Sequence, residues 1–148
     1  MKKRYGILLA ALLALSVTAC GGKTAAEAFT IKVICESSGL EKIFYSCYLN
    51  GMYYAQGGMA DLDGQELAPG TELELVFPKS YFEETSDISG FSIDFSPYGA
   101  GDTSEIMTTE KVPIAAEYGK TYTIRFSGDR GSGFHAELQE PGKERGGA

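Results

Sequence analysis

Apolar and polar residues alternate with a period of two in four segments of the chain after residue 70. The apolar positions are Leu73, Leu75 and Phe77; Phe91, Ile93 and Phe95; Tyr122, Ile124 and Phe126; and Phe134, Ala136 and Leu138. Successive side chains of a β-strand point to opposite faces of its sheet. Each segment therefore predicts a strand with one buried face and one face in solvent.

The N-terminal half of the chain predicts three further strands. The first two have apolar faces formed by Phe29, Ile31, Val33 and Cys35, and by Ile43, Tyr45, Cys47 and Leu49. Asn50-Gly51 is typical of a two-residue hairpin turn, because both of its central positions need positive φ. Residues 52–55 then form the third strand. Residues 105–114 predict an edge strand because they contain Pro113, and residues 81–86 predict a single helical turn.

Glycine- and proline-rich breaks separate these short segments, among them Gly57-Gly58 and the run from Pro97 to Gly101. Regular short strands with such breaks favour an all-β fold, an antiparallel β-sandwich of seven or eight strands over residues 28–140. The turns at 67–71 and 118–122 resemble those of immunoglobulin-like and fibronectin-like domains, and the second resembles a tyrosine corner. The resemblance implies an immunoglobulin-like sandwich, although the chain lacks the usual core tryptophan.

The first residues have the layout of a secretory signal. Lys2, Lys3 and Arg4 precede an apolar run over residues 7–17, which is short for a transmembrane helix. The following Val-Thr-Ala-Cys resembles a bacterial lipobox, and the resemblance implies cleavage before Cys20 and lipid on its thiol. We therefore expect a signal peptide (1–19), a lipidated flexible tether (20–27) and a disordered tail (141–148). The expected location is outside the cytoplasm, on the cell membrane or the outer membrane.

Removal of residues 1–19 changes the charge of the molecule. The whole chain has a formal charge of −7, and the 129 remaining residues carry 10 basic and 20 acidic residues, a charge of −10. Such an acidic surface argues against a nucleic-acid partner and against lying on anionic lipid headgroups. An acidic surface would favour a basic partner or a cation, and the need for solubility is an alternative explanation of it.

Cys35 and Cys47 would remain in an oxidising compartment, where a disulfide between them is one interpretation. A tight hairpin at Ser38-Gly39 would hold them roughly 17 Å apart and exclude that bond. A looser connection between opposite sheets would allow it. The alternative is that both are small apolar core residues.

The sequence has little that predicts catalysis or a cofactor. Asp61, Asp63 and Glu66 are a weak calcium candidate, but their spacing is not that of an EF-hand, and an acidic loop is the alternative. His135 is the one histidine and falls on the polar face of its strand. No nucleophile elbow, phosphate loop, CxxC pair or HExxH stretch occurs. We therefore expect no enzyme, no cofactor and no metal.

The aromatic residues around the Asn50-Gly51 turn are the strongest candidate for a binding surface. A two-residue turn pairs Tyr48 with Tyr53 and puts Phe44 on the same face. These three rings could form an exposed platform for a protein or a sugar. Alternatively, the hairpin is buried on both sides, for instance under the long loop from residue 57 to 69.

The sequence thus predicts a membrane-anchored lipoprotein whose sandwich is a non-catalytic protein-interaction module. A glycan- or peptidoglycan-binding module that uses surface tyrosines is the alternative. Lysozyme-inhibitor-like lipoproteins and hydrolases are further alternatives, although the tryptophan motif associated with the former is absent.

Overall fold

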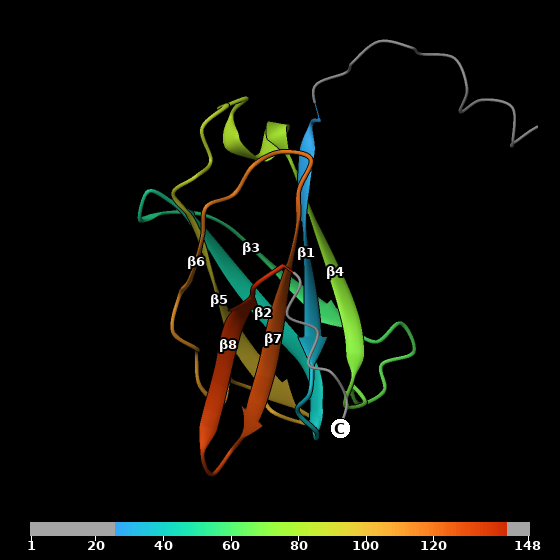
Figure 1. Ribbon diagram of the computed structural model, residues 1–148. Helices are drawn as coiled ribbons and strands as arrows, with labels where there is room; N and C mark the ends of the chain where they lie inside the picture. Colours follow the sequence, from blue (N-terminus) through green and yellow to red (C-terminus); the bar gives the residue numbers. More distant parts are fainter. Residues whose placement is uncertain (1–25, 142–148) are drawn as a thin grey trace, which may run out of the picture.

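The computed structural model describes residues 26–141, which form two four-stranded β-sheets packed face to face (Figure 1). The first sheet has the order β4-β1-β7-β8 and the second the order β3-β2-β5-β6. The elements are β1 (Ala28–Cys35), β2 (Leu40–Leu49), β3 (Met52–Ala60), β4 (Thr71–Pro78), the 3-10 helix η1 (Lys79–Phe82), β5 (Phe91–Gly99), β6 (Val112–Ile114), β7 (Thr121–Asp129) and β8 (Gly133–Gln139). The prediction of an all-β sandwich with seven or eight strands is confirmed.

The predicted apolar faces form the core between the sheets. All four predicted positions of β1 are at most 1% exposed, and Ile43, Cys47, Ile93, Phe95, Ile124 and Phe126 are fully buried. At one end of the core, Phe29 lies among Phe77, Phe82 and Phe91, with ring centroids 5.0–6.1 Å apart. Leu138 departs from its pattern: it is 39% exposed, near the end of the edge strand β8.

The sandwich is not purely antiparallel, which corrects the prediction. β1 pairs antiparallel with β4 and parallel with β7, so the first sheet is mixed. The period-two pattern fixes which side chains are buried, but it is the same for a strand running in either direction. The pattern therefore could not predict the direction of the strands.

Three local predictions also change. β3 continues to Ala60 and β5 to Gly99, so Gly57, Gly58 and Pro97 lie inside strands and not in breaks. A Cβ on Gly57 would lie 2.4 Å from the Tyr45 hydroxyl, and one on Gly58 would lie 3.0 Å from the Phe44 ring. These glycines thus make room for rings from β2. The helical turn comes earlier than predicted, at Lys79–Phe82, and β6 is only three residues long, at the edge of its sheet.

Tyr122, at the start of β7, ties the preceding loop to the sandwich. Its hydroxyl donates a hydrogen bond to the Ala115 carbonyl (3.1 Å) and accepts one from the Glu117 amide (2.9 Å). This is the geometry of a tyrosine corner, in which a strand tyrosine bonds to backbone a few residues upstream.

Among residues 26–141, no helix is long and apolar enough to cross a membrane.

Candidate binding face on the second sheet

The β2–β3 hairpin puts its aromatic residues on the outer face of the β3-β2-β5-β6 sheet. Asn50 and Gly51 have φ angles of 51° and 81°, as the predicted turn requires. Tyr48 pairs with Tyr53, and Phe44 lies on the same side of β2. Phe44 is 40% and Tyr53 is 56% exposed, so the alternative of a hairpin buried on both sides is wrong.

The rings form two edge-to-face pairs and not one flat platform. Tyr48 and Tyr53 have centroids 6.0 Å apart and an interplanar angle of 76°. Phe44 pairs in the same way with Tyr98 of β5, at 5.1 Å and 72°. Tyr98 was not among the predicted residues, although it continues the outward-facing series of Ser92, Asp94 and Ser96 on β5. The surface is therefore ridged by rings and not planar.

Asp94, next to Tyr48 on the same face, is a buried carboxylate. Alternation predicts a position in solvent, yet Asp94 is only 6% exposed. Its Oδ2 atom accepts a hydrogen bond of 3.0 Å from the Tyr48 hydroxyl. Burial and this hydrogen bond raise the pKa of Tyr48. None of the ion pairs found within residues 26–141 includes Asp94. In that part of the chain, the partner of its carboxylate is therefore one neutral donor, the Tyr48 hydroxyl.

Asp94 lies in a groove of about 440 Å³ on this face. The groove is lined by Phe44, Tyr45, Ser46, Tyr48, Gln56, Asp94, Ser96, Tyr98, Glu105 and Thr108. Residues 100–111, between β5 and β6, form one side of it. Backbone hydrogen bonds hold that segment to β5, with the amides of Ile106 and Thr109 donating to the carbonyls of Pro97 (2.9 Å) and Phe95 (2.8 Å). Side chains add to them: Tyr98 donates to Glu105 (3.0 Å), and the hydroxyls of Ser96 and Thr108 are hydrogen-bonded at 2.9 Å. The hydrogen bond to Glu105 raises the pKa of Tyr98.

Two lysines lie over the rings of this face. The Lys111 ammonium is 3.6 Å from the centroid of Tyr48. The Lys42 ammonium is 5.7 Å from the Phe44 centroid and 5.4 Å from that of Tyr98. Aromatic faces attract cations in this geometry. The chain's own lysines thus show that the rings of this surface accept positive groups.

The cysteines do not form the disulfide that the sequence left open. β1 and β2 lie in opposite sheets, so the tight hairpin between them is also wrong. Cys35 and Cys47 are buried free thiols, and they point to different acceptors, the carbonyls of Ser37 (3.7 Å) and Ala55 (3.4 Å). Burial raises the pKa of both thiols. They are small core residues here.

The calcium candidate gains no support from the structure. Asp61, Asp63 and Glu66 are exposed, and the Asp61 carboxylate accepts a hydrogen bond from the Asp63 amide at 2.8 Å. Within the described part of the chain, no three His, Cys, Asp or Glu side chains are placed to hold a metal ion. His135 is exposed on β8.

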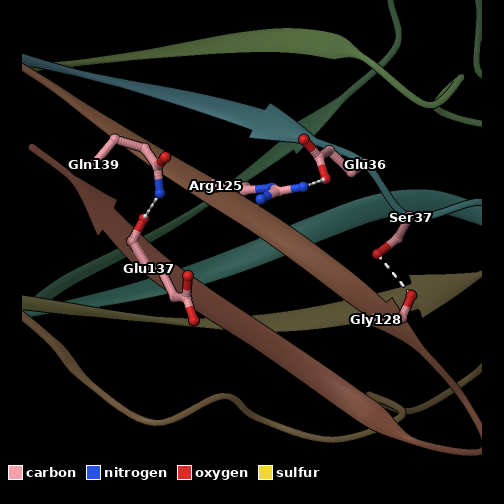
Figure 2. A network of polar contacts seen from close by, with 6 residues as sticks. All are labelled: Glu36, Ser37, Arg125, Gly128, Glu137 and Gln139. Carbon is pink, nitrogen blue, oxygen red and sulfur yellow. Dashed lines mark hydrogen bonds and ion pairs between the residues drawn. The ribbon is translucent and has the colours of Figure 1, made fainter. Parts of the chain in front are cut away.

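A polar network lies across the first sheet, on the other side of the molecule (Figure 2). Arg125 of β7 forms an ion pair of 2.5 Å with Glu36, which follows β1, and Ser37 donates to the Gly128 carbonyl at 2.9 Å. The pair with Glu36 raises the pKa of Arg125. These contacts join the end of β1 to β7, and we assign them a structural role.

Cys20, the predicted lipidation site, lies outside the described residues, as do most of the tether and the tail.

Comparison with known proteins does not assign a family. No protein-family model matches the chain, and no curated protein matches it either. A solved structure titled "Crystal Structure of Gram Negative Toxin" matches with a TM-score of 0.39 and 10% sequence identity. The match covers 78% of this chain but only 23% of that chain.

Proposed function

We propose that this protein is a lipid-anchored, non-catalytic interaction module that binds a protein partner through the outer face of its second sheet. The anchor is the lipid expected on Cys20, outside the cytoplasm. For the domain we propose an immunoglobulin-like class, supported by the two four-stranded sheets and by the tyrosine corner at Tyr122.

The observation that supports this proposal is the groove around Asp94. Interfaces are enriched in exposed tyrosine and phenylalanine, and Phe44 and Tyr53 present such rings beside the groove. Among the described residues, the Asp94 carboxylate accepts a single hydrogen bond. An ionised carboxylate has about four acceptor sites, so Asp94 can still receive donors from a ligand. A lysine or arginine side chain would supply donors and charge together, and the rings would contact its aliphatic part.

The proposal is tested by photo-cross-linking in the native envelope. A photoreactive amino acid replaces Ser96, which lines the groove, and in a matched control it replaces Thr121, which is exposed on the opposite sheet. One recurrent protein is expected from position 96 and not from position 121. Asp94→Asn, which keeps the shape and removes the charge, should reduce its recovery. Equal recovery from both positions, or none from position 96, would contradict the proposal.

The lining of the groove also favours a second candidate, glycan binding. The hydroxyls of Ser46, Ser96 and Thr108 and the carboxylates of Asp94 and Glu105 can exchange hydrogen bonds with sugar hydroxyls. Retention of the protein on purified peptidoglycan, and its loss on Tyr48→Ala, would favour this candidate. Absence of retention together with a specific protein cross-link would favour the first.

A further inference from the structure

The four edge strands of the sandwich differ in how they discourage pairing with another chain. Charged residues, prolines and short length are the usual devices. β4 carries Glu72, Glu74 and Pro78, and β8 carries Glu137. β6 is three residues long and contains Pro113. β3 is nine residues long and carries no charge and no proline.

The outer edge of β3 also has unpaired backbone groups in the part of the chain that the structure describes. In the described residues it pairs only with β2, and none of the other backbone hydrogen bonds of residues 26–141 involves Met52–Ala60. Its one irregularity is the extra residue Tyr54, near the hairpin turn, where the register with β2 shifts. Residues 55–60 beyond this bulge are regular and end in the acidic turn that contains Asp61 and Asp63.

The rings of β2 extend over this open edge on both faces. Gly57 and Gly58 have no side chains, and the space that a Cβ would take is bordered by Tyr45 at Gly57 and by Phe44 at Gly58. Rings that cover strand glycines supply the apolar contact that the strand itself lacks. A strand added at β3 would therefore gain backbone hydrogen bonds and an aromatic contact close to the edge.

We propose that β3 pairs antiparallel with β3 of a second copy of this chain, about a two-fold axis at Gly58. Residues directly opposite in a sheet point to the same face, so a continuous sheet requires outward residues to meet outward residues. Gln56, Gly58 and Ala60 are paired with Ser46, Phe44 and Lys42, which line the outer side of β2. Any two-fold axis through a residue of β3 satisfies this rule. An axis at Gly58, the middle of these three outward residues, sets Gln56 opposite Ala60 of the second copy.

Charge selects the antiparallel direction. A parallel pair would put the two acidic turns side by side, where like charges repel. The antiparallel pair sets Asp61 opposite Ala55 of the second copy and keeps the acidic turns at opposite ends. It also brings the two Phe44 rings toward the axis on the outer face. The contact is isologous and closes as a dimer, so it does not propagate into a fibre.

Disulfide trapping tests the register. The Gln56→Cys/Ala60→Cys variant of the full chain, purified in detergent, is oxidised and run on a non-reducing gel. Opposed Cα atoms lie about 4.5–5.5 Å apart, within disulfide range, whereas these positions in one copy are separated by roughly 14 Å. Glu72→Cys/Val76→Cys is the matched control, because both positions are exposed, on one face and four residues apart on edge strand β4.

The expected result is a covalent dimer as the main product of the β3 variant, with at least tenfold less from the control. The wild-type chain sets the background from its own cysteines. Light scattering should give the unmodified chain a molar mass twice that of one copy. The Gln56→Lys variant should have the molar mass of a single copy. A chain that stays monomeric, or a β3 variant that cross-links no better than the control, overturns the proposal. The readout is oligomeric state, so this outcome leaves the proposed ligand of the groove unaffected.

Discussion

The hydrogen bond between Tyr48 and Asp94 predicts a measurable loss of stability in Tyr48→Phe. The substitution removes only the hydroxyl, the one group that donates to the Asp94 carboxylate in the described residues. The ring stays, and with it the contacts to Tyr53 and Lys111. Hydrogen bonds to charged groups contribute about 1.5–3 kcal/mol, and a buried acceptor without a partner is costly. We expect the free energy of unfolding to fall by about 2 kcal/mol.

Urea denaturation followed by tyrosine fluorescence measures this change. A decrease of about 2 kcal/mol should lower the midpoint with little change in slope, because the surface exposed on unfolding is nearly the same. Tyr53→Phe is the matched control: Tyr53 lies in the same ring pair, 56% exposed, and its hydroxyl has no hydrogen bond in the described residues. Its effect should stay within about 0.5 kcal/mol.

A double-mutant cycle with Asp94→Asn separates the charge from the contact. The amide oxygen of asparagine still accepts from Tyr48, but it is neutral and costs less when it loses that donor. Tyr48→Phe should therefore cost about 1 kcal/mol less in the Asp94→Asn variant than in the wild type. If Tyr48→Phe changes stability by less than about 0.5 kcal/mol, water in the groove replaces the lost donor, and the argument from the burial of Asp94 is refuted.

Three further outcomes follow from the fold. Tyr122→Phe removes two backbone hydrogen bonds and should lower the free energy of unfolding by about 1–2 kcal/mol in urea melts; an unchanged midpoint would count against the tyrosine corner. Gly57→Ala puts a methyl group against Tyr45 and should cost about 1–3 kcal/mol by the same assay, and a neutral result would mean that the ring is free to move. Burial raises the pKa of Cys35 and Cys47, so both should alkylate slowly at pH 8 in the native protein and rapidly in urea; mass spectrometry would show fast native labelling if either thiol were accessible.

The sequence predicts the faces of the strands better than their connections. A period of two assigns Phe29, Ile31 and Val33 to the core because the pleat of a strand imposes it. The same period carries no information on direction, so the parallel pairing of β1 with β7 could not be predicted. Gly57 and Gly58 suggested a break because their propensity is low, and the rings packed over them reverse that preference.

The candidate site was predictable only in part. The hairpin turn at Asn50-Gly51 is a local signal, and it correctly paired Tyr48 with Tyr53. Tyr98 and the burial of Asp94 depend on contacts between segments distant in the chain. The segment 100–111 folds against β5, and the pattern of residues within that segment does not predict this position.

The central place of β1 in its sheet has a consequence for how the chain folds. β1 is held on one side by β4 and on the other by β7, and its end meets β7 in the contact of Ser37 with Gly128, 91 residues away. Closing a loop of that length costs about 4 kcal/mol of chain entropy before any contact offsets it. Synthesis runs from the N-terminus, so one edge of β1 stays unpaired until β7, near the end of the chain, has been made. Such long-range pairing predicts slow folding, which fits the export that we propose for this protein, because an exported chain has to stay unfolded during translocation.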